Sequence, residues 1–371
     1  MIKKITGLVL CLALMSGIYI CCIEGGSGAL DGQISRDAQA QSDTKNTSAQ
    51  NAGSQNGSSE NYILAFVPKS GENKFNEKEA EGFKSACKRL GATAVVSYPK
   101  EPTADAQIEV IMDLIEQKVD GISVAANDAN ALSDVLTQAA NAGIKINTVD
   151  SDTAMNLRSV YCNPADADEV AAALIETVYE ICGGEGQFAI LSTTPGAANQ
   201  MAWIDSIKAY MENDSKYSYL DLVEVAYGKD DADLSAQKAG ELLSDYPDLK
   251  CICAPTTVGM LAAAKTITQT TTSVKLTGLG LPSEMEPYIG TEGLGICPRM
   301  YLWNPRNLGA LSAYTLFELC NGEITGAQGD SFSCPLGRFN VTLDGDGVNE
   351  IVLGEPFGFD RSNVSEWVKV Y

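Results

Sequence analysis

The sequence contains no histidine. Without histidine the chain cannot build a Ser–His–Asp triad, an HExxH zinc site or a Cys/His zinc finger. Basic residues are also scarce, because 26 Lys and Arg stand against 48 Asp and Glu and give a formal net charge of −22. Nucleic-acid-binding proteins need a basic surface, so the composition predicts no nucleic-acid partner. Hydrophobic residues make up an ordinary 45%, which predicts a buried core.

Residues 1–23 resemble an export signal. Lys3 and Lys4 precede the apolar stretch Ile5–Ile23, and a basic start followed by an apolar run is typical of such signals. Cys21 and Cys22, at the end of the stretch, resemble the lipidated cysteine of a bacterial lipoprotein. The stretch is also close to the length that spans a bilayer, so an uncleaved membrane anchor is an alternative, as is plain secretion. Each alternative places the rest of the chain outside the cytoplasm.

Residues 24–60 are composed of Gly, Ser, Ala, Gln, Asn, Asp and Thr with almost no large apolar side chain. Such a segment cannot bury enough surface to offset its ordering entropy. It is predicted to be a flexible tether that holds a globular body at the outer face of the cytoplasmic membrane.

The body beyond the tether contains cysteines whose spacing does not match a small disulfide-stabilised domain. Several lie in apolar runs, where cysteine behaves as a small hydrophobic residue. We expect buried free thiols, with one or two disulfides as the alternative, and we predict no metal site and no other cofactor. The residues are Cys87, Cys162, Cys182, Cys251, Cys253, Cys297, Cys320 and Cys334.

Strand-like and helix-like patterns alternate after residue 61. A repeat of about 30 residues is typical of βαβ units with parallel strands. The alternation begins again after Gly183–Gly186, so we predict an α/β fold of two doubly wound parallel-sheet lobes joined by a hinge. The expected strands are 62–68, 93–98, 120–125, 145–149, 187–191, 220–225, 249–254 and 274–278, and the expected helices are 77–90, 104–117, 129–142, 165–182, 200–211, 234–243 and 260–266.

Polar and aromatic side chains follow the expected strands. Ligands of open parallel sheets bind beyond the carboxyl ends of the strands, so the cleft between two such lobes is the predicted site. Carboxylates, amides and an amine can bind adjacent sugar hydroxyls, while indole rings cover the apolar faces of the sugar. The candidate ligand-binding residues are Lys69, Asp150, Asn199, Gln200, Trp203, Pro255, Thr257, Trp303 and Asn304.

Some of these residues have structural alternatives. Asn199 precedes a helix and is equally suited to be its N-cap, and Asp152 is a better cap than Asp150. Trp203 and Trp303 are also suited to packing in the core. The sequence alone leaves these alternatives open.

Six motifs occur in order along the body and cover it from Tyr62 to the C-terminus. They are FVPK (66–69), VDSD (149–152), NQMAW (199–203), PTTVG (255–259), TGLGLPSEM (277–285) and LWNPRNLG (302–309). This set resembles the type I periplasmic-binding-protein receptors of ABC importers, in the branch that contains rhamnose-type and autoinducer-2-type receptors.

The resemblance implies a set of ligand contacts. Autoinducer-2 receptors use a lysine, two aspartates, a glutamine, a proline carbonyl and an alanine. Lys69, Asp150, Gln200 and Pro255 stand at matching positions in this sequence. These four residues are therefore expected to contact the ligand.

Three positions depart from the autoinducer-2 pattern. Asn199 replaces the second aspartate, Thr257 replaces the alanine, and Asn304 stands where those receptors tend to have aspartate. The PTTVG and LWNPRNLG motifs are more similar to those of the rhamnose-type importers. We therefore expect a monosaccharide such as a deoxyhexose, with autoinducer-2 or a related furanosyl compound as the alternative.

The resemblance also implies three crossovers between the lobes. The N-terminal lobe would contain residues 61–163 and about 296–332. The C-terminal lobe would contain residues 164–295 and about 333–371.

The function that the resemblance implies is that of a monomeric, extracytoplasmic receptor. It would close on its ligand by a hinge and deliver it to the permease subunits of an ABC importer. A sensor module for a chemoreceptor or histidine kinase is the alternative. An enzyme is not predicted, because Asp150 and Asp152 are one residue apart and no second acidic cluster converges on them.

Overall fold

The computed structural model describes residues 61–71, 73–290 and 292–371. The predicted export signal (1–23) and tether (24–60) lie outside these residues. Within the described ranges, no helix combines the length and the hydrophobicity that crossing a membrane requires.

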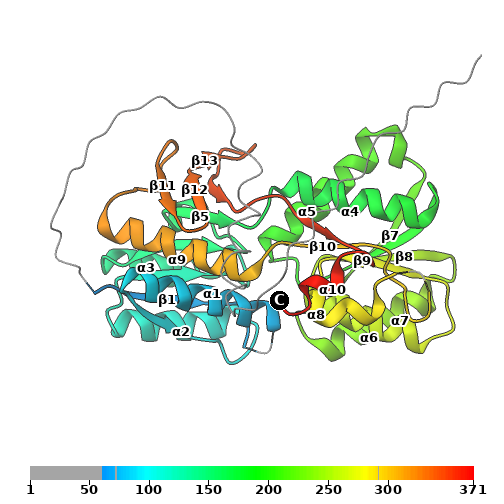
Figure 1. Cartoon of the computed structure of the whole chain (residues 1–371), viewed down its shortest axis with the longest axis horizontal. Coiled ribbons are helices and arrows are strands. Elements are labelled where there is room, and N and C mark those ends of the chain that lie inside the picture. Colours follow the sequence, from blue (N-terminus) through cyan, green and yellow to red (C-terminus); the bar gives the residue numbers. More distant parts are fainter. Residues whose placement is uncertain (1–60, 72, 291) are drawn as a thin grey trace, which may run out of the picture. The chain divides into compact units, whose positions relative to one another are not determined.

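The first lobe is a seven-stranded sheet with helices on both faces (Figure 1). Its strands are β1 (Ile63–Val67), β2 (Thr93–Val96), β3 (Gly121–Val124), β4 (Lys145–Val149), β5 (Val160–Asn163), β13 (Thr342–Leu343) and β14 (Asn349–Val352), and its helices are α1 (Lys74–Leu90), α2 (Ala104–Glu116), α3 (Ser133–Asn141) and α9 (Pro305–Asn321). The strand order is β13-β14-β5-β4-β3-β1-β2, and only the β13–β14 pair is antiparallel.

Both faces of this sheet are buried because alternate residues of a strand point to opposite sides. Leu64 and Phe66 of β1 pack with residues of α1 and α9, whereas Ala65 and Val67 pack with residues of α2 and α3. This two-sided burial explains why the strands are short, nearly continuous apolar runs.

The second lobe is a four-stranded parallel sheet with the order β7-β6-β8-β9. Its strands are β6 (Gly186–Ser192), β7 (Leu220–Tyr227), β8 (Leu249–Ala254) and β9 (Lys275–Gly278). Its helices are α4 (Ala167–Cys182), α5 (Ala198–Asn213), α6 (Ala232–Asp245), α7 (Thr257–Gln269) and α8 (Pro282–Met285), with short 3-10 turns at Ser215–Tyr217 and Glu286–Tyr288. A further 3-10 turn, Met155–Leu157, connects β4 to β5 in the first lobe. The two parallel sheets confirm the predicted α/β fold of two doubly wound lobes.

Helices α1 and α9 cross at two glycines. A Cβ added to Gly82 would lie 1.9 Å from the carbonyl oxygen of Arg306, and one added to Gly309 would lie 1.9 Å from that of Glu79. The two backbones therefore touch directly, which fixes α1 against a helix that is far away in sequence.

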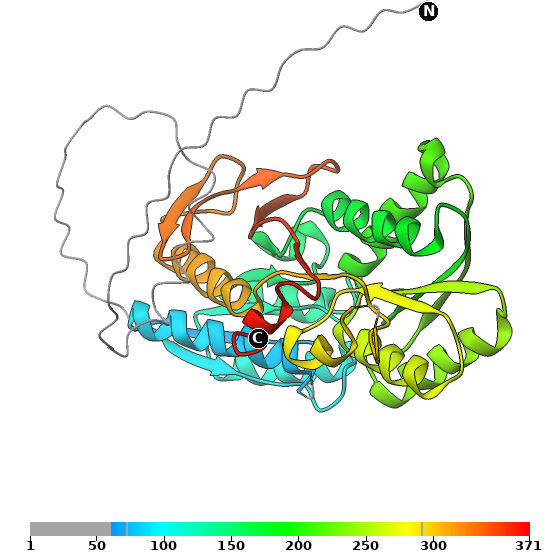
Figure 2. The same cartoon turned by 45° about the vertical axis from the view of Figure 1, so that its right-hand side comes forward.

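The C-terminal segment differs from the predicted lobe boundaries. Residues 333–371 were expected in the second lobe, but β14 pairs in parallel with β5 and so extends the first sheet. The parallel partner gives β5 a second neighbour, since its other edge is taken by β4. The tail then returns, and β15 (Phe357–Phe359) pairs with β10 (Met300–Leu302), as Figure 1 and Figure 2 show. The remaining elements are the β11 (Ser331–Cys334) and β12 (Gly337–Asn340) hairpin and α10 (Val364–Trp367).

Most expected elements are present within a few residues of their predicted ends. One expected helix begins later than predicted, and one strand of the first sheet was not expected. Helix α3 begins at Ser133 and not at Ala129, because the Asp128 carboxylate accepts hydrogen bonds from the backbone N–H of Asn130 and Ala131 and forms a turn there. Strand β5 was not predicted at all.

The eight described body cysteines are all free, as predicted. Six are buried, and Cys320 and Cys334 are half-buried. Burial raises the pKa of the Cys253 thiol to about 12. A buried thiol of this kind stays protonated and packs as a small apolar side chain.

Candidate ligand-binding site

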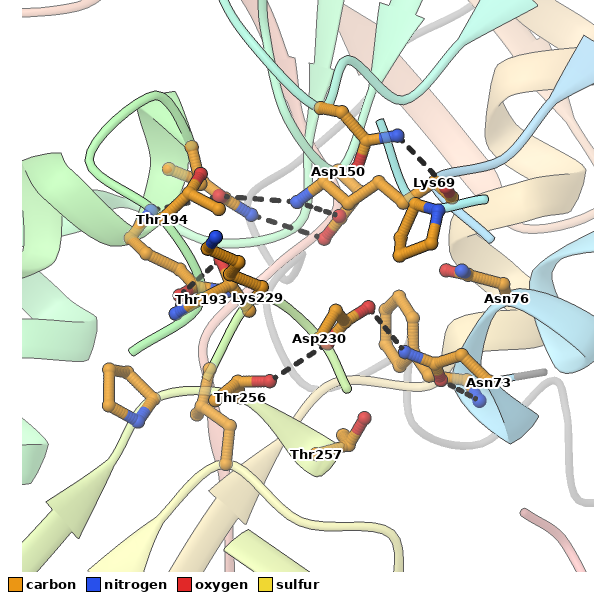
Figure 3. Close-up of a pocket in the computed structure, with 18 of the residues that line it drawn as sticks. Lys69, Asn73, Asn76, Asp150, Thr193, Thr194, Lys229, Asp230, Thr256 and Thr257 are labelled. Atoms are coloured by element: carbon orange, nitrogen blue, oxygen red, sulfur yellow. Dashed lines mark hydrogen bonds and ion pairs between the residues drawn. The ribbon is translucent and has the colours of Figure 1, made fainter. Parts of the chain in front are cut away.

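A pocket lies where the carboxyl ends of strands from both lobes meet (Figure 3). It encloses about 590 Å³ of empty space, including its open mouth. Every predicted ligand residue except Asn304 lines it. The lining residues are Lys69, Asn73, Phe75, Asn76, Pro102, Asn127, Asp150, Thr193, Thr194, Ala197, Asn199, Gln200, Trp203, Lys229, Asp230, Pro255, Thr256, Thr257, Leu279, Leu302 and Trp303.

Lys69, Asp150 and Asn199 form a closed polar triangle across the lobes. The Lys69 Nζ lies 3.0 Å from Asp150 Oδ2 and donates to Asn199 Oδ1 at 3.5 Å. The Asn199 Nδ2 in turn donates to Asp150 Oδ1 at 3.3 Å. Lys69 and Asp150 follow β1 and β4 of the first lobe, whereas Asn199 is on the first turn of α5 in the second. The N-cap alternative for Asn199 is wrong, since Ala197 occupies that position.

The backbone of Asp150 adopts an unusual conformation that directs its side chain into the pocket. Its φ is 60°, in the left-handed region that non-glycine residues seldom adopt. The Tyr161 hydroxyl donates to the Asp150 carbonyl oxygen at 2.8 Å and holds the turn. Asp152 faces elsewhere, because its carboxylate is paired with Arg158 at 2.6 Å and accepts the Thr153 N–H. The two aspartates of this motif are thus separated into a pocket residue and a structural residue.

Gln200 is fixed by its carbonyl oxygen. Oε1 accepts hydrogen bonds from Ser192 Oγ at 2.6 Å, Thr193 N at 2.9 Å and Thr193 Oγ1 at 3.0 Å. The amide orientation is therefore set, and its NH₂ group is the part that remains to donate to a ligand.

Asp230 is a pocket residue that the sequence reasoning did not identify. It follows β7 and, like Lys229, has a positive φ, of 57°. Its Oδ2 accepts from Asn73 Nδ2 of the first lobe at 3.2 Å, and its Oδ1 accepts from Thr256 Oγ1 at 3.3 Å. Desolvation raises the pKa of Asp230, while the charge of Lys69 opposes the shift. The signal in the sequence is its position shortly after an expected strand, which it shares with Lys69 and Asp150.

Three aromatic side chains form the apolar part of the lining. The rings of Trp203 and Trp303 lie 5.7 Å apart, and Phe75 meets Trp303 edge-on at 6.3 Å. All three are buried, yet the Trp303 Nε1 has no hydrogen-bond partner among the described residues. A buried indole N–H normally has one, so this donor is available to a ligand.

Pro255 and Thr257 border the pocket at the junction of β8 and α7. Thr257 is the first residue of α7, and Thr256 precedes it at the N-cap position. The free backbone N–H groups of this first turn give the second lobe further donors beside the aromatic side chains.

Asn304 is the predicted ligand residue that the structure places elsewhere. Its Oδ1 accepts from the backbone N–H of Arg306 at 3.0 Å and of Asn307 at 3.3 Å, so it caps α9. The first N–H groups of a helix have no partner inside it, so the asparagine at the N-cap satisfies two of them, and Pro305 at the first helical position has no N–H that would need one.

Both carboxylates of the pocket have partners and are not arranged as an acid–base pair. Asp150 is paired with Lys69, and Asp230 is held by Asn73 and Thr256. Within the described chain, no group of three or more Cys, Asp or Glu side chains is placed to hold a metal ion. The arrangement is suited to binding a neutral, hydroxyl-rich molecule.

Comparison with known proteins agrees with this geometry. Residues 64–324 match the family model described as a periplasmic binding protein domain. The chain belongs to the periplasmic binding protein family. This confirms the family that the six motifs indicated and the type I fold of two α/β lobes.

Two similar solved structures are more than 30% identical to this member of the family. An ABC transporter solute-binding protein of Clostridium phytofermentas with bound L-rhamnose is 45% identical, with a TM-score of 0.82, covering 84% of this chain and 99% of that chain. A sugar ABC transporter protein of Actinomyces odontolyticus is 34% identical, with a TM-score of 0.65, covering 82% and 97%.

A third structure is similar in fold alone. LsrB of Clostridium saccharobutylicum in complex with AI-2 is 21% identical, with a TM-score of 0.76, covering 82% of this chain and 99% of that chain.

Proposed function

We propose that this protein is the sugar-binding component of an ABC importer and that it binds L-rhamnose, or a monosaccharide very similar to it, in the interlobe pocket. The observation that carries the proposal is the 45% identity over nearly the whole body to a solute-binding protein with bound L-rhamnose. The pocket adds support from its own chemistry.

The polar side of the pocket suits a row of sugar hydroxyls. Asp150 accepts, Lys69 and the Gln200 amide donate, and Asn199 does both. Hydrogen bonds with a charged partner contribute about 1.5–3 kcal/mol each. A few of them give micromolar or tighter binding after the costs of association are subtracted.

The aromatic side of the pocket suits the C–H faces of the same molecule. Phe75 comes from the first lobe, Trp203 from the second, and Trp303 from the crossover between them. The unpartnered Nε1–H of Trp303 gives this side one directional donor. A sugar would therefore contact both lobes at once.

This double contact supports a hinge-closing receptor. We propose that residues 61–163 move with α9 and the β13–β14 pair. Residues 164–302, which include β10, move with β15 and the end of the tail. Two pairs at the rim of the pocket join the lobes: Asn73 with Asp230, and Lys74 with Glu284 at 3.0 Å. Members of the family are binding proteins, and catalysis is not part of the proposal.

The location and partners follow from the same proposal. The protein acts as a monomer outside the cytoplasm, is tethered to the membrane through residues 1–60, and delivers sugar to permease subunits. Radiolabelled palmitate separates the anchoring alternatives, since incorporation that is lost when Cys21 and Cys22 are replaced by Ser supports lipidation. Recovery of unlabelled protein in the medium would contradict tethering.

Isothermal titration calorimetry of the purified chain tests the ligand. L-rhamnose should bind with a dissociation constant in the micromolar range or below, and more tightly than L-fucose, D-arabinose or autoinducer-2. Tighter binding of autoinducer-2 would instead make the protein a receptor for that signal. The proposal fails if L-rhamnose produces no binding heat.

A further inference from the structure

Glu79 is a fully buried carboxyl group without a partner. Its side chain is on α1 with no exposed surface, and neither Oε1 nor Oε2 has a hydrogen-bond partner in the described part of the chain. Buried carboxylates are normally paired or hydrogen-bonded, because leaving the charge unpaired in the interior is very costly. The family motifs and the pocket lining do not include this residue.

Glu79 lies directly behind the polar triangle of the pocket. Helix α1 starts at the pocket wall, where Asn73 is its N-cap and Asn76 lines the cavity. Glu79 is three residues beyond Asn76 and so faces the same side of the helix one turn deeper. Lys69 and Asp150 are the charged groups that act on it electrostatically.

The described surroundings of Glu79 offer it no free cation. Lys69 is already bound to Asp150, and Arg306 at the start of α9 pairs with the exposed Glu81. The sheet face that α1 and α9 cover presents neutral groups, such as Ser123 and Asn147, which are neighbours in the β3–β4 register. Burial and then the negative charge of Glu77 raise the pKa of Tyr98, which follows β2, so its neutral hydroxyl adds no positive charge.

Helix α9 packs against the backbone of α1 at Glu79. The Glu79 carbonyl oxygen is the atom that a Cβ on Gly309 would approach to 1.9 Å, so the backbone of α9 lies against it. Burial raises the pKa of Glu79 well above its ordinary value, and the negative charge of Asp150 raises it further, with only Lys69 opposing. The neutral carboxylic acid is the form that this position accommodates.

We propose that Glu79 is a positioning residue that is a neutral carboxylic acid at pH 7 and below, and thereby leaves the charge of Lys69 committed to Asp150 and the bound sugar, and that it ionises at alkaline pH. This inference rests on the proposed sugar-binding function of the pocket. Ionisation of Glu79 would add a second carboxylate that attracts Lys69 and repels Asp150, and so would pull the triangle apart. Sugar affinity would then fall as the pH rises through the pKa of Glu79.

Two neutral variants and a matched control test the coupling. Glu79→Gln keeps the shape of the side chain and removes its titratable group. Glu79→Leu also removes the titratable group and leaves no polar atoms in the side chain. The control, Glu77→Gln, changes an exposed glutamate on the same helix. L-rhamnose affinity is measured by calorimetry from pH 5.5 to 9.5. Wild type and E77Q should lose about fivefold or more across this range relative to E79Q. At pH 5.5 the wild-type and E79Q affinities should agree within about threefold, a difference smaller than the typical coupling between sites.

Parallel wild-type and E79Q profiles would overturn the proposal, as would a tenfold loss of affinity in both E79Q and E79L at pH 5.5. Infrared spectroscopy supplies a test that needs no ligand. The wild-type minus E79Q difference spectrum at pH 7 should contain the C=O stretch of a protonated carboxyl group, and a carboxylate band there would refute the neutral state. If no sugar binds but the protonated band is present, the proposed function fails while the charge state of Glu79 is supported.

Thermal stability gives a second ligand-independent readout. In the unfolded chain the pKa of Glu79 is near 4.5, whereas burial raises its pKa in the folded state. The protonated side chain therefore contributes its full share of stability below pH 4.5, and this share is lost as the pH rises through the folded-state pKa. The melting temperature of E79Q should rise relative to wild type between pH 4.5 and 8, and a constant difference would contradict the assignment.

Discussion

Replacing Lys69 with methionine should abolish most of the sugar affinity. The Lys69 Nζ and Asp150 Oδ2 are 3.0 Å apart, and the side chains are only 10% and 8% exposed. At an effective dielectric constant near 20, this separation corresponds to an attraction of about 5–6 kcal/mol before desolvation is subtracted. Removing one partner of a buried pair typically costs about 3–5 kcal/mol, because the other charge is left unpaired.

The open mouth of the pocket lowers that cost, since water can reach Asp150 when no sugar is bound. With sugar bound the water is displaced, and the unpaired carboxylate must be buried. We expect Lys69→Met to weaken L-rhamnose binding by about 2–4 kcal/mol, a loss of roughly 30- to 700-fold. Calorimetry measures the affinity, and a thermal melt measures the accompanying loss of stability.

Two further variants separate a ligand contact from a purely structural ion pair. Lys69→Met combined with Asp150→Asn removes both charges, so stability should partly recover while affinity stays low. Lys74→Met breaks a pair at the rim, where the lysine side chain is 58% exposed, and should change affinity by less than about fivefold. Binding by K69M within threefold of wild type would refute the reasoning, and so would a double variant with restored affinity.

Four other substitutions test the remaining assignments. Trp303→Phe keeps an aromatic ring but removes the unpartnered Nε1–H, so calorimetry should show about a 5- to 20-fold loss of L-rhamnose affinity, and an unchanged affinity would contradict a direct contact. Asn304→Ala removes the cap of α9 and should lower the free energy of unfolding by about 1 kcal/mol in denaturant melts, while a large loss of affinity would restore Asn304 to the site. Gly309→Ala forces a Cβ to within 1.9 Å of a backbone oxygen and should lower the free energy of unfolding by about 1–3 kcal/mol or more. Gly240→Ala, in α6 with open space around it, is the control and should raise the free energy of unfolding by about 0.5–1 kcal/mol. A change of the same sign in both variants would refute the helix-crossing geometry.

The lobes could be predicted from the sequence because their strands are buried on both faces. Strands such as β1 and β4 are then short apolar runs, and the helices between them end at glycines such as Gly91, whose φ of 74° suits a left-handed cap. Strand β5 escaped prediction because no α-helix separates it from β4, only the 3-10 turn Met155–Leu157, so the alternation of strands and helices does not indicate it.

The position of the tail could not be predicted because β pairing between distant segments leaves no periodic signal. Polar and apolar side chains alternate in residues 342–352 as they do in any exposed hairpin, and this pattern does not indicate β5 as the partner strand. What decides the pairing is the free edge that β5 offers after β4 has taken its other side. Asn304 was misassigned for a related reason, since an asparagine after a strand has the same sequence context whether it faces a ligand or caps the next helix.

Asp230 is a pocket residue that the periodicity of the sequence does not indicate, because its position depends on its backbone conformation. In the described chain, four non-glycine residues have positive φ, and three of them, Asp150, Lys229 and Asp230, line the pocket. Such conformations cost about 1–3 kcal/mol each and persist only where neighbouring contacts enforce them. Tyr161 enforces the turn at Asp150, and Asn73 and Thr256 hold Asp230. Asn73 belongs to the first lobe and Thr256 to the second, so the Asp230 carboxylate is held by contacts from both lobes.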